Sequence, residues 1–211
     1  PFGKNRLQYE EFNWQKMEFD DFTVFFYGKG KNMAIYTARN ADQTISEVER
    51  FFDYPVRGER LQFVVYQKLE HYRQSNVGIP ETDESNIGGI TQIAGNKIFL
   101  YYDGNLNNLR KQVRKGVSEV LIAQMLFGDN WREMIKNSTL LNFPEWYIDG
   151  LTWYATEPWN VEADDRLRDI VLSGRYKNFN RLRGLDSEIA GRSLWYYIGE
   201  TYGSKVIPNI M

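Results

Sequence analysis

The sequence predicts an α+β protein in which a mixed β-sheet lobe with one helix, residues 1–104, precedes a helical lobe, residues 105–211. Two observations predict this order. Before Gly104, apolar residues alternate or run together in strand-length segments, whereas after it they recur every three or four residues. No low-complexity tract or long linker separates the halves, so we expect a single domain over residues 1–211 that shares one core.

The amino-terminal half contains several strand-length segments and one helix. The expected strands are residues 19–27, 60–67, 89–94 and 96–102. Between the first two, apolar residues at helical spacing predict a helix over 32–52, which Tyr54-Pro55 ends. Residues 78–89 are polar and rich in turn formers, which predicts an exposed loop.

The carboxy-terminal half begins with a long amphipathic helix from Leu106, which Gly128 ends. Further helices are expected at residues 131–136, 144–155, 161–173, 179–183 and 191–202. Gly174 and Gly203 are typical helix stops, because glycine readily adopts the left-handed conformation that closes a helix.

Composition excludes several classes of protein. Hydrophobic residues are 42% and charged residues 26%, which excludes a disordered chain. A net charge of −2 gives no general electrostatic reason to bind nucleic acid, and the apolar runs are too short to span a bilayer. The absence of cysteine excludes disulfides and thiolate metal sites. The single histidine, His71, leaves little for histidine-based catalysis or zinc binding, and we expect it to be exposed or hydrogen-bonded.

Two segments of the helical half carry a resemblance. The first is Arg-Lys-Gly-Val-Ser-Glu-Val-Leu over residues 114–121, and the second is Phe-Pro-Glu-Trp-Tyr-Ile-Asp-Gly-Leu-Thr-Trp-Tyr over residues 143–154. Together they resemble the gluzincin metallopeptidases, specifically the peptidase MA-like family, with its pattern R-H-E-x-x-H-V-L followed by P-x-W-x-x-E-G-L-x-x-Y. The resemblance implies a zincin-like fold for residues 1–211.

The same resemblance implies a lost metal site. In the active pattern two histidines and one acidic residue bind zinc, and a glutamate activates water. Carried over by position, the first histidine is Lys115, the glutamate is Gly116, the second histidine is Glu119 and the third ligand is Asp149. Lysine repels zinc, and glycine has no side chain to take a proton. The resemblance therefore implies an inactive relative with no metal and no cofactor.

Other interpretations of these positions stay open at this point. Lys115 and Glu119 are four residues apart, which is also typical of a solvated ion pair on a helix surface. Gly116 in an apolar helix is equally typical of a close helix contact. Because two carboxylates without a metal need a cation, we expect Lys115, Glu119 and Asp149 to form a structural cluster.

The opening of the chain also resembles a known arrangement. Phe-Gly-Lys-Asn-Arg-Leu-Gln-Tyr over residues 2–9, then Trp14 and residues 22–27, resemble the start of large Gram-negative envelope proteins in which such a domain precedes a β-propeller. This implies an exported, periplasmic or envelope-associated protein. We therefore expect an export signal before Pro1 and further domains after Met211, and the resemblance implies that a β-propeller is one of them.

The function expected from these observations is a non-catalytic domain that binds a protein or peptide or acts as a scaffold, with Trp146, Tyr147 and Tyr154 as candidate cleft residues. Two alternatives remain. One is an active hydrolase that uses Glu119 and Asp149 as an acid/base pair or as metal ligands. The other is a carbohydrate-binding module, suggested only by the 16% aromatic content.

Overall fold

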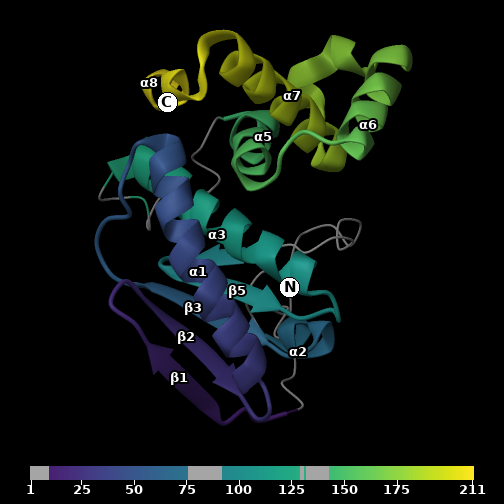
Figure 1. Ribbon diagram of the computed structural model, residues 1–211. Helices are drawn as coiled ribbons and strands as arrows, with labels where there is room; N and C mark the ends of the chain where they lie inside the picture. Colours follow the sequence, from purple (N-terminus) through teal and green to yellow (C-terminus); the bar gives the residue numbers. More distant parts are fainter. Residues whose placement is uncertain (1–9, 76–91, 129–130, 132–142) are drawn as a thin grey trace, which may run out of the picture. The chain divides into compact units, whose positions relative to one another are not determined.

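The computed structural model describes residues 10–75, 92–128, 131 and 143–211 (Figure 1). The chain divides into two compact units. Unit 1 comprises residues 1–46 and 57–117, and unit 2 comprises residues 47–56 and 118–211. In the described part of the chain, every helix is too short or too polar to cross a membrane.

Unit 1 is built on a five-stranded mixed sheet in the order β1-β2-β3-β5-β4. Its strands are β1 (Trp14–Glu18), β2 (Phe22–Tyr27), β3 (Leu61–Tyr66), β4 (Gln92–Ala94) and β5 (Lys97–Tyr101). The three central strands β2, β3 and β5 are parallel, and the two outer strands pair antiparallel to their neighbours. The sequence predicted an α+β protein with a mixed sheet, and the combination of a mixed sheet with several helices is confirmed.

One face of this sheet carries the core of unit 1. Val24 pairs with Phe63, and Phe63 pairs with Ile98, so these three side chains lie on the same face, and none is exposed. Helices α1 (Lys31–Phe52) and α3 (Leu106–Phe127) cross the sheet in Figure 1. Their amino-terminal parts belong to unit 1.

A buried amide joins α3 to the sheet. The side chain of Gln112 accepts a hydrogen bond from the Tyr101 amide at 3.0 Å and donates one to the Tyr101 carbonyl at 2.9 Å. Gln112 is fully buried, so these two bonds replace the water that its amide loses. The end of β5 is thereby held against the first half of α3.

Unit 2 is helical. Its elements include α5 (Glu145–Thr156), α6 (Val161–Leu172), α7 (Gly184–Tyr202) and the short α8 (Ile207–Ile210), with 3₁₀ turns η3 (Arg175–Arg181) and η4 (Ser204–Val206). Helix α5 packs along α7, and Trp195, Leu151 and Ile207 are among the buried side chains. A smaller cluster of Ala163, Ile170 and Ile189 joins α6 to α7.

Most elements agree with the expectations. The helix expected at 32–52, the long helix ended by Gly128, and the helices at 144–155 and 161–173 are α1, α3, α5 and α6, each within a few residues. The strands expected at 19–27, 60–67 and 96–102 are the shorter β2, β3 and β5, and β4 falls within the strand expected at 89–94, of which residues 89–91 lie outside the described residues. The expected loop at 78–89 lies outside the described residues, as does the helix at 131–136 except for Trp131.

Three expectations differ from the structure. Helix α7 begins at Gly184 rather than at Gly191, because its N-cap, Arg183, makes no side-chain capping bond that would mark the start. The short helix at 179–183 is the end of η3. Strand β1 and helix α2 (Leu69–Gln74) were not expected, since β1 is an exposed edge strand without apolar alternation and α2 is only six residues long.

Candidate functional site

Lys115, Gly116 and Glu119, which stand where the family pattern has its two histidines and its glutamate, lie in the middle of α3. Lys115 and Glu119 are half-buried and Gly116 is buried. Being four residues apart, Lys115 and Glu119 share one face of α3. Each of the two has an interaction with another group, so neither is a bare surface charge. Lys115 belongs to unit 1 and Glu119 to unit 2.

Asp149, the fourth position, is half-buried on α5 and also interacts with another group. It lies in unit 2. The expected cluster of Lys115, Glu119 and Asp149 would join the two units and stays a prediction. Within the described ranges, 10–75, 92–128, 131 and 143–211, no three histidine or acidic side chains converge in a way that would hold a metal ion.

Gly150, which follows Asp149, is required by a close helix crossing. A Cβ added to Gly150 would lie 2.4 Å from the main-chain carbon of Gly191 in α7, and a Cβ added to Gly191 would lie 1.9 Å from the Trp146 carbonyl oxygen. Both distances are far below van der Waals contact. The acidic-Gly-Leu triplet therefore has a packing role, since its glycine lets α5 approach α7 and its Leu151 is fully buried.

Trp146 and Tyr147, two of the candidate cleft residues, are half-buried and engaged in packing. The Trp146 indole N–H donates to Asn180 at 2.8 Å, and its ring meets the edge of Phe179. The Tyr147 carbonyl accepts the Trp195 indole N–H at 2.9 Å. Burial raises the pKa of the Tyr147 phenol. These contacts hold the start of α5 against η3 and α7.

Tyr154, the third candidate cleft residue, fills a notch on α7 made by Gly199. A Cβ at Gly199 would lie 2.0 Å from the Tyr154 hydroxyl oxygen. The Tyr154 ring also lies 5.5 Å from Phe51 and 6.5 Å from Tyr196, measured between ring centroids. Burial raises the pKa of the Tyr154 phenol, and the Glu200 charge acts in the same direction. Gly199 and Tyr154 are thus a second glycine-dependent contact between α5 and α7.

A buried cation directly follows Gly191 on α7. Arg192 is 3% exposed, and its Nη2 donates to the Glu157 and Pro158 carbonyls at 3.2 and 2.6 Å. Its guanidinium lies 5.5 Å above the Trp159 ring. Burial lowers the pKa of Arg192, and Glu157 acts in the opposite direction. The carbonyls and the ring replace solvent around this charge and fix the turn after α5.

A second constellation, in unit 1, was not expected from the sequence. The Tyr27 hydroxyl lies 2.7 Å from His71 Nδ1, and His71 Nε2 lies 3.3 Å from a Glu10 carboxylate oxygen. The main-chain N–H of Gln67 donates a hydrogen bond to the Tyr27 hydroxyl oxygen at 2.9 Å. The expectation that His71 is hydrogen-bonded is confirmed. The sequence offered one signal for this region, because β2, β3 and β5 each end in a tyrosine.

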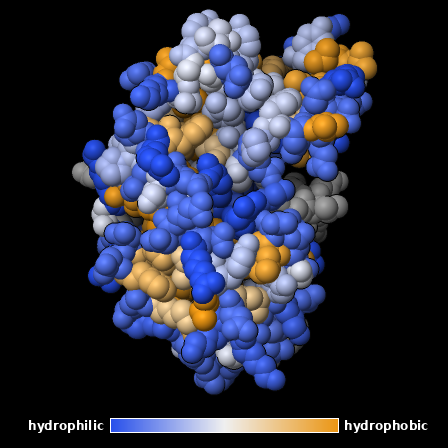
Figure 2. Space-filling view, viewed as in Figure 1, coloured by the Kyte–Doolittle hydropathy of each residue, from blue (hydrophilic) through white to orange (hydrophobic). Residues whose placement is uncertain are grey.

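The apolar side chains on one face of the described part of the chain are dispersed. On the face seen in Figure 2, hydrophobic groups are small and separated by hydrophilic side chains. The most exposed apolar side chains of unit 2 are Leu172, Val161 and Tyr202. Val161 and Leu172 stand at opposite ends of α6 and Tyr202 is the last residue of α7, and single exposed apolar residues of this kind are common on protein surfaces.

Comparison of the chain with protein-family models, with curated proteins and with solved structures finds no match.

Proposed function

We propose that this chain is a non-catalytic domain of the zincin-like type that binds a protein or peptide or serves as a scaffold. One observation carries the proposal: the glycine crossing of α5 and α7 at Gly150 and Gly191 gives the second segment of the resemblance a packing role that requires no metal. The chemistry of the other segment agrees, because Lys115 and Gly116 stand where the family pattern has a ligand and a general base.

The packing of the aromatic residues supports a scaffold more than an open catalytic cleft. Trp146, Tyr147 and Tyr154 are each half-buried against η3, α7 or α1. The location in the cell envelope and a following β-propeller rest only on the resemblance of residues 2–27 and belong to the proposal.

The sharpest test is to restore the metal site. The double variant Lys115→His, Glu119→His places two imidazoles at the family positions while Asp149 supplies the third ligand. We expect it to bind one zinc ion per chain, measured by metal analysis after dialysis and by titration calorimetry. Removing a group that only orients a metal ligand costs about 10–100-fold in metal affinity, so removing the ligand itself with Asp149→Ala should weaken binding at least about tenfold.

Two outcomes would overturn the proposal. If the double variant binds zinc no better than the wild type, or if Asp149→Ala leaves its affinity unchanged, the three positions do not converge and the zincin-like arrangement is wrong. If the wild-type protein itself carries near-equimolar zinc, or cleaves peptides in a way that Glu119→Ala abolishes, the alternative of an active hydrolase replaces the non-catalytic domain.

A further inference from the structure

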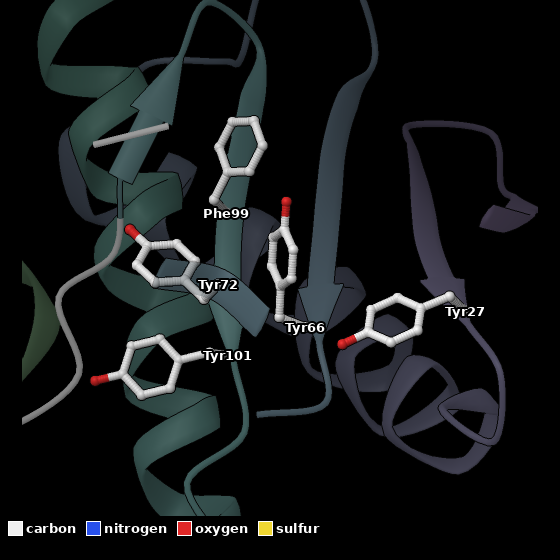
Figure 3. Packing of buried hydrophobic residues seen from close by; sticks show 5 residues of the cluster. All are labelled: Tyr27, Tyr66, Tyr72, Phe99 and Tyr101. Carbon is white, nitrogen blue, oxygen red and sulfur yellow. The ribbon is translucent and has the colours of Figure 1, made fainter. Parts of the chain in front are cut away.

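Aromatic side chains form a continuous row on the second face of the sheet in unit 1. Tyr27, Tyr66 and Tyr101 are the last residues of the parallel strands β2, β3 and β5, and Trp14 pairs with Tyr27 at the edge. Figure 3 shows the rings of Tyr27, Tyr66, Tyr72 and Tyr101 side by side across these strand ends. Tyr72, from α2, contacts both the Tyr66 ring and the Tyr101 ring.

Neighbouring rings in this row are close together. The ring centroids are 5.0 Å apart for Trp14 and Tyr27, 5.4 Å for Trp14 and Tyr66, and 6.2 Å for Tyr27 and Tyr66. The row continues at 5.6 Å from Tyr66 to Tyr72 and at 5.3 Å from Tyr72 to Tyr101. Contact between oxidisable rings is the arrangement in which an electron passes from ring to ring in short steps.

The row has one exposed end. Trp14 is 39% exposed, whereas Tyr27, Tyr66 and Tyr101 are 5%, 5% and 2% exposed. An oxidant in solution therefore reaches the Trp14 indole more readily than these three phenols. Trp14 contacts both Tyr27 and Tyr66, so either ring is placed to return an electron to it.

Tyr27 differs from Tyr66 in its proton acceptor. The Glu10 carboxylate can only accept a hydrogen bond, and it faces His71 Nε2, so the tautomer that carries its proton on Nε2 fits both partners and presents Nδ1 as an acceptor to the Tyr27 hydroxyl. The hydroxyl of Tyr66 instead lies against the Ser75 hydroxyl, which is a far weaker base than imidazole. Loss of an electron makes a phenol strongly acidic, so a phenol bonded to imidazole is the easier one to oxidise.

We propose that Trp14 and Tyr27, at the exposed edge of this row, form a one-electron relay in which Tyr27 is the residue that ends up oxidised. An external one-electron oxidant of the metal(III)-complex class takes an electron from the Trp14 indole and is reduced to the metal(II) form, and Tyr27 returns one electron to Trp14. The Tyr27 O–H bond breaks, its proton forms an N–H bond at His71 Nδ1, and a neutral phenoxyl radical remains beside an imidazolium that Glu10 balances. A reductant of the thiol or ascorbate class then supplies one electron, and the proton returns from Nδ1 to the phenol oxygen.

The test uses photogenerated tris(bipyridine)ruthenium(III), with persulfate as the electron acceptor, as the oxidant. Exposed tyrosines give short-lived radicals that couple with one another, whereas a radical on buried Tyr27 is protected, so the long-lived part of the phenoxyl signal is followed by transient absorption and electron paramagnetic resonance. We expect Tyr27→Phe to lose this part. Tyr66→Phe is the matched control, since Tyr66 is equally buried in the next strand, and it should retain the signal.

Two further measurements do not depend on the folding of Tyr27→Phe. His71→Gln keeps a hydrogen-bonding side chain but removes the base, and should also lose the long-lived signal. In the wild type, formation of the radical should slow in deuterated solvent, because a proton moves with the electron. Equal long-lived signals in the wild type and His71→Gln, loss of the signal in Tyr66→Phe instead of Tyr27→Phe, or no long-lived signal in the wild type would overturn the relay. A cluster that only packs the core would give the last result.

Discussion

The two units use aromatic residues in opposite ways. In unit 1 the Tyr27 ring is buried with polar groups placed to meet its hydroxyl, since the Gln67 main-chain N–H and His71 both bond the phenol. In unit 2 the α5 residues Trp146 and Tyr154 fit against missing side chains on α7, Trp146 with its main chain at Gly191 and Tyr154 with its phenol at Gly199. The first arrangement depends on hydrogen bonds to a buried hydroxyl, and the second depends on space.

The difference teaches which changes each unit tolerates. Removing a hydroxyl from the tyrosine row leaves its hydrogen-bond partners unsatisfied, because a buried donor without an acceptor has lost its hydration and gained no bond in exchange. Adding an atom at the α5–α7 crossing forces two helices apart, because packed interiors have no room for an extra methyl group. The predictions below test this contrast, from the largest expected effect to the smallest.

The crossing should be broken most severely by Gly191→Ala. The added methyl group would lie 1.9 Å from the main-chain oxygen of Trp146, which cannot move without shifting α5. We expect a loss of about 3 kcal/mol or more in the free energy of unfolding, measured by urea denaturation. Gly199→Ala is the matched control on the same helix, because it meets the movable end of the Tyr154 side chain instead. Equal losses would show that main-chain proximity is not what limits the crossing.

Alkaline pH should weaken the tyrosine row. Burial raises the pKa of Tyr27 from 10 to about 12, so the folded state holds this proton where the unfolded chain has released it. The resulting stability is fully present below pH 10 and is lost as the pH rises through about 12. A shift of this size corresponds to about 2–3 kcal/mol. Denaturation between these pH values should show a steeper fall in the wild type than in Tyr27→Phe, and parallel curves would contradict the assignment.

Tyr27→Phe at neutral pH should remove about 2 kcal/mol of stability, because the Gln67 amide and His71 both lose a partner in a buried setting. Tyr102→Phe is the control, since the Tyr102 hydroxyl bonds the Gly104 carbonyl at an exposed site and its loss should cost less than about 0.5 kcal/mol. The two variants are compared by their midpoints of urea unfolding, with the dependence of the free energy of unfolding on urea concentration unchanged. A cost at Tyr27 no larger than that at Tyr102 would mean that the network adds nothing beyond packing.

The smallest effect is expected on α3, the helix that contributes to both units. Lys115 is half-buried and Lys111 is exposed, although both side chains have interactions. If Lys115 replaces a metal beside Glu119 and Asp149, Lys115→Ala should cost about 1 kcal/mol, against less than about 0.5 kcal/mol for Lys111→Ala. Melting temperatures of the two variants decide this. Equal shifts in melting temperature would show that Lys115 does not take the place of a metal beside Glu119 and Asp149. They would not affect the argument from the glycine crossing of α5 and α7.

Local patterns predicted the elements with strong periodicity. Alternation around Val24 and the three- and four-residue spacing of α1 and α3 need only their own neighbours to be recognised. Strand β1 was missed because, as an exposed edge, it has no apolar alternation. Helix α7 was predicted seven residues too short because Gly191, which resembles a helix boundary in sequence, is an interior residue of that helix.

For the candidate sites, too, part of the description follows from the sequence and part only from the tertiary structure. The sequence by itself determined the mixed α/β class, the chemistry of Lys115, Gly116, Glu119 and Asp149, and the presence of a single histidine. Only the tertiary structure decided what Gly150 and His71 do. A glycine's role depends on which backbone approaches it, and Gly191 is 41 residues away along the chain from Gly150. Likewise, His71 acquires its partners from Tyr27 and Glu10 only when the strands and α2 come together, because hydrogen bonds act at contact and not along the sequence.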